Sequence, residues 1–119
     1  MSEWVKLKVL IIEDESIVAM MIEDLIVDMG HEVVGIAGRL EQAQRLAEEL
    51  AVDFAIVDVN LNGQHTYPVA ETLKARGVPF VFATGYGNTE RPERFAVVPT
   101  ITKPYGMAEL RQALEALSA

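Results

Sequence analysis

The sequence predicts an α/β domain of the doubly wound type, in which helices cover both faces of a parallel sheet. Apolar runs of strand length alternate with segments whose apolar residues repeat at helical spacing. Gly, Pro or Asn stands at the changes between them. The apolar runs are continuous rather than alternating, which is typical of parallel strands that are buried on both faces and joined by right-handed crossovers.

The first unit is an apolar strand, residues 8–12 (KVLII), followed by a helix, residues 16–29, that Gly30 ends. A stripe of apolar residues predicts the side of this helix that faces the core: Ile17, Val18, Met21, Ile22, Leu25 and Met29. Met20 and Val27 fall on the opposite side. The thioether side chain of Met20 is adaptable and is a candidate contact for a partner helix.

The second and third units repeat this pattern. Residues 32–37 (EVVGIA) predict a strand and residues 40–50 a helix. Residues 54–58 (FAIVD) predict the next strand, and the polar segment that follows is expected to be a loop. A helix is expected at residues 69–76, closed by Gly77.

The fourth unit has a strand at residues 79–84 (PFVFAT) and a helix that we expect to be short or irregular. Gly85 and Gly87 raise the entropic cost of ordering that helix, and Pro92 removes a backbone donor from it. A final strand at residues 97–102 and a helix at residues 107–117 complete the domain.

Length and composition reduce the number of functional classes to which the chain could belong. At 119 residues the chain is expected to form one domain, residues 1–119. No apolar run approaches the roughly 20 residues of a membrane helix, so we expect a soluble, cytoplasmic protein with no membrane partner. The absence of cysteine excludes thiolate metal sites and thiol nucleophiles. A net charge of −8 with no basic stripe argues against nucleic acid.

Polar side chains gather at the ends of four expected strands. Glu13 and Asp14 follow the first strand, Asp58 ends the third, Thr84 ends the fourth and Lys103 follows the last. Sites in doubly wound sheets form outside the carboxyl ends of the strands, so all five belong on one rim. Two unit charges about 4 Å apart interact by roughly 4 kcal/mol at a surface-like dielectric, and three clustered carboxylates therefore favour a bound cation.

A hard divalent ion, Mg²⁺ above all, suits carboxylates that have no His or Cys neighbours. With a metal ion and the Lys103 ammonium beside it, Asp58 could attack phosphorus, and Thr84 could hydrogen-bond the incoming oxygens. Taken singly, the acids are explained better as helix caps or turn residues, and Lys103-Pro104 could simply start a helix. Their joint placement is what favours a site.

These residues, in this order and near this spacing, make the whole chain resemble the receiver domain of response regulators. The resemblance implies the flavodoxin-like strand order 2-1-3-4-5. It implies that Asp14 ligates Mg²⁺ directly, Glu13 through water, Asp58 by its carboxylate and Asn60 by its backbone carbonyl. It further implies that Lys103 pairs with the phosphoryl oxygens and that the Lys103-Pro104 bond is cis, which is plausible because a tertiary amide lowers the cost to about 1 kcal/mol.

The resemblance also implies a function in two-component phosphorelay signalling. Asp58 would accept a phosphoryl group from the phosphohistidine of a sensor histidine kinase or a phosphotransfer protein. The chain would act as a single-domain regulator without an output domain, as a relay, a phosphate sink or a binder of a downstream protein. It would catalyse its own phosphotransfer and slow dephosphorylation rather than turn over a substrate as an enzyme.

Three features depart from the usual receiver pattern. Thr100 occupies the position of the aromatic switch residue, three before the lysine, and the Met-Pro pair after the phosphoacceptor is absent. Residues 82–85 (FATG) are similar to a motif in a subset of receivers that often serve HWE-type histidine kinases.

Two alternatives remain open. A Mg²⁺ phosphohydrolase of the haloacid dehalogenase type also uses an aspartyl nucleophile, but it needs a second Asp where this chain has Asn60. A pseudo-receiver would bind partners without being phosphorylated. His31 and His65 are expected to be solvated loop residues outside the site.

Overall fold

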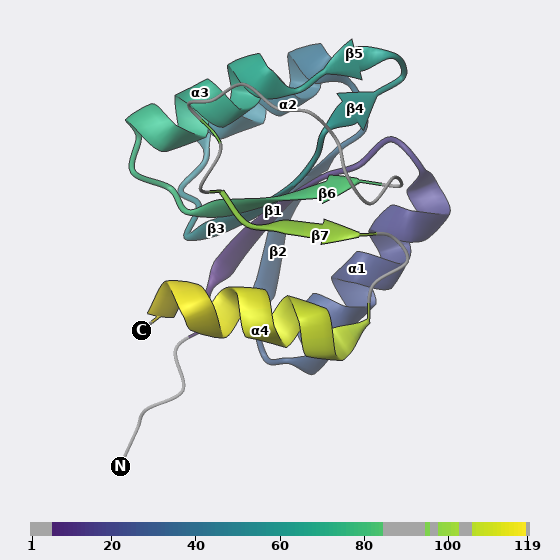
Figure 1. Ribbon diagram of the computed structural model, residues 1–119, viewed down its shortest axis with the longest axis vertical. Helices are drawn as coiled ribbons and strands as arrows, with labels where there is room; N and C mark the ends of the chain where they lie inside the picture. The colour runs from purple at the N-terminus through teal and green to yellow at the C-terminus, as the bar shows by residue number, and fades with distance from the viewer. Residues whose placement is uncertain (1–5, 85–94, 96–97, 103–105, 119) are drawn as a thin grey trace.

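The computed structural model describes residues 6–84, 95, 98–102 and 106–118 (Figure 1). These residues include a five-stranded parallel sheet of order β2-β1-β3-β6-β7. Its strands are β1 (Lys8–Ile12), β2 (Glu32–Ala37), β3 (Phe54–Asp58), β6 (Phe80–Thr84) and β7 (Thr100–Thr102). The helices are α1 (Ser16–Asp28), α2 (Leu40–Glu49), α3 (Tyr67–Ala75) and α4 (Met107–Ser118). The predicted parallel sheet and its strand order, 2-1-3-4-5 when only these strands are numbered, are confirmed.

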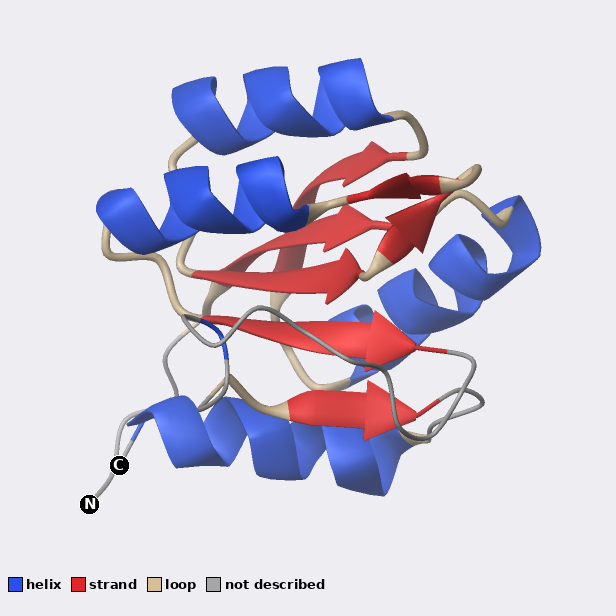
Figure 2. Ribbon diagram, turned by 45° about the horizontal axis from the view of Figure 1, so that its top comes forward, coloured by secondary structure: helices blue, strands red, loops and turns tan. Residues whose placement is uncertain are grey.

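Helices lie on both faces of the sheet, with α2 and α3 on one face and α1 and α4 on the other (Figure 2). Alternate residues of β1 enter the two core layers: Leu10 and Ile12 pack on the α2 and α3 side, and Val9 and Ile11 on the α1 and α4 side. Both faces of the strand must therefore be apolar, which explains its continuous apolar run.

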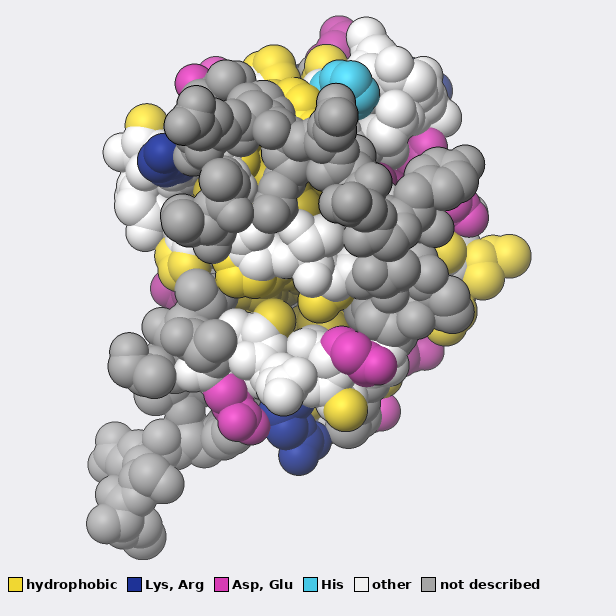
Figure 3. Space-filling model, in the orientation of Figure 1, with side chains coloured by type: hydrophobic (Ala, Val, Ile, Leu, Met, Phe, Trp, Pro, Cys, Tyr) yellow, Lys and Arg dark blue, Asp and Glu magenta, His cyan; other side chains and the backbone are white. Residues whose placement is uncertain are grey.

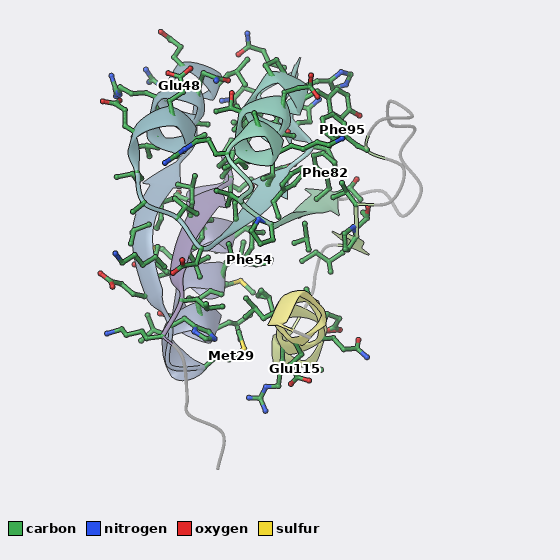
Figure 4. All side chains as sticks on the ribbon, turned by 90° about the vertical axis from the view of Figure 1, so that its left-hand side faces the viewer. Met29, Glu48, Phe54, Phe82, Phe95 and Glu115 are labelled. Atoms are coloured by element: carbon green, nitrogen blue, oxygen red, sulfur yellow. The ribbon has the colours of Figure 1, made fainter. Side chains whose placement is uncertain are left out.

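Four aromatic rings fill the core beneath α3: Tyr67, Phe80, Phe82 and Phe95. Figure 4 shows Phe82 and Phe95 together on the α3 side of the sheet, and their ring centroids lie 5.5 Å apart. The ring of Tyr67 stacks on that of Phe95 at 5.8 Å. This cluster joins β6, α3 and the chain just before β7 into one packed layer.

Two of the expected helix ends are confirmed by backbone geometry. Gly30, which follows α1, has a φ of 88°, and Gly77, which follows α3, has a φ of 72°. These left-handed conformations are cheap for glycine and end helices commonly. The helix expected after Thr84 falls in residues 85–94, outside the described part of the chain.

The predicted core stripe of α1 is wrong in part. Ile17 is 74% exposed and Met21 51% exposed, whereas the buried residues are Ala19, Ile22 and Ile26, with Met29 just beyond the helix. Val18 and Leu25 pack at the margin of the core. The helix is apolar on nearly every side, so several rotations fit its spacing, and the one adopted presents the small Ala19 to the sheet.

The segment expected to be a loop after Asp58 contains a short antiparallel hairpin, β4 (Asn60–Leu61) and β5 (Gln64–His65). Its turn residues, Asn62 and Gly63, have φ values of 51° and 87°. Positive φ at both positions is typical of a type I′ turn, whose twist matches that of the flanking strands.

The expectation for His31 is also wrong, because its side chain is buried rather than solvated. His31 Nδ1 accepts a hydrogen bond of 3.0 Å from the backbone N–H of Leu7, just before β1. Burial lowers the pKa of His31 below its usual value, since it disfavours the charged ring. His65 is exposed, as expected, and the centroid of its ring lies 5.2 Å from that of the Tyr67 ring.

None of the described helices combines the length and the apolar composition that crossing a bilayer requires.

Candidate metal and phosphoacceptor site

Three carboxylates meet at the carboxyl end of the sheet. Glu13, Asp14 and Asp58 each offer an oxygen, and these oxygens all lie within 4.8 Å of one another. The strand register explains the meeting, because Ile12 of β1 is paired with Val57 of β3, so the residues that follow them lie side by side. Glu13 and Asp58 are buried and Asp14 is half-buried.

Each of these carboxylates accepts a hydrogen bond from a backbone amide. Glu13 Oε2 accepts from the N–H of Glu15 at 3.0 Å, Asp58 Oδ1 from Asn60 at 3.1 Å, and Asp14 Oδ2 from Asn62 at 3.1 Å. Such bonds to an ionised oxygen are stronger than neutral ones and offset part of the repulsion between the three charges. These backbone bonds therefore hold the three carboxylates close together.

Thr84 lies beside Asp58 on the next strand. Ala83 of β6 is the partner of Asp58 in the parallel register, and Thr84 follows it as a buried hydroxyl at the strand end. The structure thus brings Glu13, Asp14, Asp58 and Thr84 to one rim, as predicted. Lys103, and with it the expected cis Lys103-Pro104 bond, lies outside the described residues.

Two further predicted positions are described. Asn60 begins β4, and its backbone N–H contacts Asp58 as described above. Thr100, at the position of the aromatic switch in the receiver pattern, is exposed at the start of β7 and is paired with Phe82 of β6.

Thr66 is a supporting residue that the sequence reasoning missed. Its side chain is completely buried, and its hydroxyl hydrogen-bonds to the carbonyl oxygens of Asp58 at 2.6 Å and Val59 at 3.2 Å. It thereby fixes the backbone that carries the Asp58 carboxylate. The available signal was its place directly before a helix start marked by Pro68, where a Thr often caps.

The donor set fits a hard divalent cation. Its ligands are carboxylate oxygens without thiol or imidazole groups, which suits Mg²⁺. Because the three oxygens lie within 4.8 Å of one another, one ion could lie between these residues.

The strand order, with an acidic cluster at the carboxyl ends of the adjacent strands β1 and β3, defines a CheY-like α/β domain with its site at the topological switch point. A family model described as the response regulator receiver domain matches residues 9–115. The chain belongs to this family.

Among similar solved structures is SdrG from Sphingomonas melonis Fr1, with a TM-score of 0.85 and 40% sequence identity over 96% of this chain and 98% of that one. The transcriptional regulatory protein PdtaR from Mycobacterium tuberculosis is 29% identical over 91% of this chain and 55% of its own length. The phyllosphere-induced regulator PhyR from Methylorubrum extorquens is 34% identical over 74% of this chain and 32% of its own length. The chain thus spans about half or less of these two curated relatives.

Proposed function

We propose that this chain is a response-regulator receiver that accepts a phosphoryl group on Asp58 from a phosphohistidine of a sensor histidine kinase or a phosphotransfer protein. The supporting observation is the convergence of Glu13, Asp14 and Asp58 within 4.8 Å, in a chain of the receiver family. The protein works in the cytoplasm and signals through contacts with another protein, as a relay, a sink or an effector.

The proposed transfer begins with attack of an Asp58 carboxylate oxygen on phosphorus. The phosphorus–nitrogen bond of the phosphohistidine breaks, its electron pair returns to the imidazole, and the product is an acyl phosphate on Asp58. Glu13, Asp14, the Asp58 carboxylate and the Asn60 carbonyl would hold Mg²⁺, which when bound offsets the charge of the phosphoryl oxygens. Thr84 would donate its hydroxyl proton to one of these oxygens, and Lys103 would pair with another.

The hairpin geometry supports the role of the Asn60 carbonyl. Thr66 N–H donates to Val59 O at 3.0 Å, and bonded and non-bonded pairs alternate in an antiparallel ladder. The next pair, Asn60 and His65, is therefore of the non-bonded kind. The N–H and C=O of Asn60 lie on the edge away from β5, where the N–H reaches Asp58. A residue of a non-bonded pair presents its C=O to the same edge as its N–H, which would bring the Asn60 carbonyl near the acidic cluster.

The exposed apolar side chains of α1 support a kinase contact next to the site. Ile17, Met20 and Met21 are 74%, 62% and 51% exposed, and α1 begins two residues after Asp14. In Figure 3, hydrophobic side chains protrude at the edge of the molecule where α1 lies. Residues 82–85 (FATG) are the ground for proposing a kinase of the HWE type.

The test is incubation with Mg²⁺ and a small acyl-phosphate donor, followed by intact-mass analysis. We expect one labile phosphoryl adduct on the wild-type chain and none on Asp58→Ala, while the exposed control Asp24→Ala is labelled normally. An adduct on Asp58→Ala at the wild-type rate would overturn the assignment. Steady phosphate release from monoesters would instead support the hydrolase, and a chain that stays unmodified would support the pseudo-receiver.

A further inference from the structure

We propose that the β4–β5 hairpin is a brace for the metal site and that Asn62, at its tip, is a positioning residue for Asp14. This inference rests on the proposed function, because it assumes that the acidic cluster binds Mg²⁺. It gives the hairpin a role besides that of the proposed Asn60 carbonyl ligand, namely to hold the side chains of other ligands in place.

The hairpin is fixed to the site at its base. There, the Asn60 N–H donates to Asp58 Oδ1 at 3.1 Å and the Thr66 hydroxyl lies 2.6 Å from Asp58 O. One contact holds the carboxylate of Asp58 and the other holds its backbone. The base therefore moves with Asp58.

The tip of the hairpin is fixed to the opposite side of the site. The Asn62 N–H donates to Asp14 Oδ2 at 3.1 Å, and the Asn62 side-chain amide donates to the carbonyl of Gly38 at 3.4 Å. Gly38 follows β2 and itself lies against Asp14, since a Cβ there would be 3.7 Å from Asp14 Cα. The tip thus ties the Asp14 carboxylate to the ends of β1 and β2.

The two attachments together span the acidic cluster. Asp58 is held at one end of a hydrogen-bonded six-residue hairpin, residues 60–65, and Asp14 at the other. Asp14 follows β1 without belonging to it or to α1, so its own strand does not fix its side chain. The hairpin supplies this restraint and sets the separation of two ligands before the ion arrives.

Both attachments of the hairpin depend on the backbone geometry of its turn. Asn62 and Gly63 have φ values of 51° and 87°, and the Gly63 N–H donates to Asn60 Oδ1 at 2.8 Å. A Cβ on Gly63 would meet nothing within 4 Å, so a side chain there would act only through backbone strain. Gly77 has the same property, with a φ of 72° and open space around it, and it lies at the end of α3. It offers a matched control.

The experiment compares Gly63→Val with Gly77→Val by titrating each full chain with Mg²⁺ in a calorimeter. Both variants force a β-branched residue into a left-handed conformation and should lose similar stability in thermal melts. We expect the Mg²⁺ dissociation constant to rise about tenfold for Gly63→Val and to stay within about twofold of wild type for Gly77→Val.

A second variant, Asn62→Gly, covers the case in which Gly63→Val does not fold. It keeps the backbone conformation and the N–H, and removes the side-chain bond to Gly38. We expect it to weaken Mg²⁺ binding about threefold and to speed amide exchange at residue 62 without metal. Equal Mg²⁺ affinities for Gly63→Val and Gly77→Val, or for Asn62→Gly and wild type, would overturn the brace. A wild-type chain that binds no Mg²⁺ would overturn the proposed function and the affinity claim with it.

Discussion

At the scale of single residues, Asp14 has two opposing effects on the stability of the metal-free protein. Its carboxylate adds to the repulsion from Glu13 and Asp58, and it accepts the bond from Asn62. Asp14→Asn removes the charge and keeps an oxygen that can accept that bond. The substitution therefore separates the electrostatic effect from the hydrogen bond.

We expect Asp14→Asn to melt about 4 °C higher than wild type without metal, which corresponds to about 1 kcal/mol for a domain of this size. The difference should shrink in high salt, because salt screens the repulsion. With Mg²⁺ the order should reverse as the ligand is lost. Asp24→Asn on the exposed side of α1 is the control, and a lower metal-free midpoint for Asp14→Asn would contradict the reasoning.

His31 makes the fold sensitive to acid. Its Nδ1 accepts the Leu7 N–H, so the ring must be neutral there, and burial lowers its folded pKa below 6.5. The unfolded chain therefore binds the proton more readily. The neutral His31 ring makes its full contribution to the free energy of unfolding above about pH 6.5. This contribution is lost as the pH falls through the pKa of His31 in the folded state.

His31→Asn should remove this dependence, because the Asn amide oxygen can accept the same bond without titrating. We expect the free energy of unfolding of wild type to fall between pH 6.5 and pH 5 relative to that of His31→Asn, measured by urea denaturation. His65→Asn, at an exposed histidine, should follow the wild-type curve. Parallel curves for wild type and His31→Asn would show that the buried ring does not titrate in this range.

The positions of residues at strand ends could be predicted from the sequence. The burial of a residue that depends on a distant partner could not. Glu13, Asp14, Asp58 and Thr84 could be placed because the ends of parallel strands share one rim. The partner of His31 is 24 residues away, and nothing in the local pattern around a Gly-His pair indicates it. Burial that depends on such a contact leaves no periodic pattern in the sequence.

At the scale of elements, α1 shows how a correct helix can be given a wrong orientation. Its type and its end near Gly30 followed from spacing and from glycine. Its rotation did not, because apolar residues occur around most of its circumference. The packing of Ala19 and Ile22 against β1 and β3 selects the rotation, and that information lies in the sheet.

The difference between the expected and the observed rotation of α1 can be tested with two isoleucines of this helix. Ile22→Ala should lose about 2 to 4 kcal/mol of stability, because it leaves a cavity in the core. Ile17→Ala should change stability by less than about 0.5 kcal/mol, because its side chain is already 74% exposed. Urea denaturation of both variants tests this, and a large loss for Ile17→Ala would restore the stripe expected from the sequence.

The hairpin was missed for a different reason. Its strands have two residues each, too short for an alternation of apolar and polar residues to appear. The Asn62-Gly63 pair was a usable signal, since Asn-Gly favours the type I′ turn of two-residue hairpins.

At the scale of the whole molecule, the fold class and strand order followed from the alternation of apolar and amphipathic segments. The parallel sheet leaves few topologies once right-handed crossovers are required. The same logic located the site without any knowledge of its contacts. What it could not supply were the amide donors from Glu15, Asn60 and Asn62, since these depend on local turns that the strand pattern does not specify.

The position of β1 between β2 and β3 also decides when the chain can fold during its synthesis. β1 is made before its neighbours, yet β3 begins only at Phe54. The α4 residues that cover one face of the sheet are made after all five strands: Leu110, Ala113 and Leu114. Contacts between such distant segments form slowly and leave apolar strands uncovered meanwhile. A ribosome-bound chain should therefore stay protease-sensitive and bind chaperones until α4 has left the exit tunnel. Arrest-peptide force measurements should show one late folding event, and an event already present before residue 107 emerges would point to an independently stable amino-terminal half.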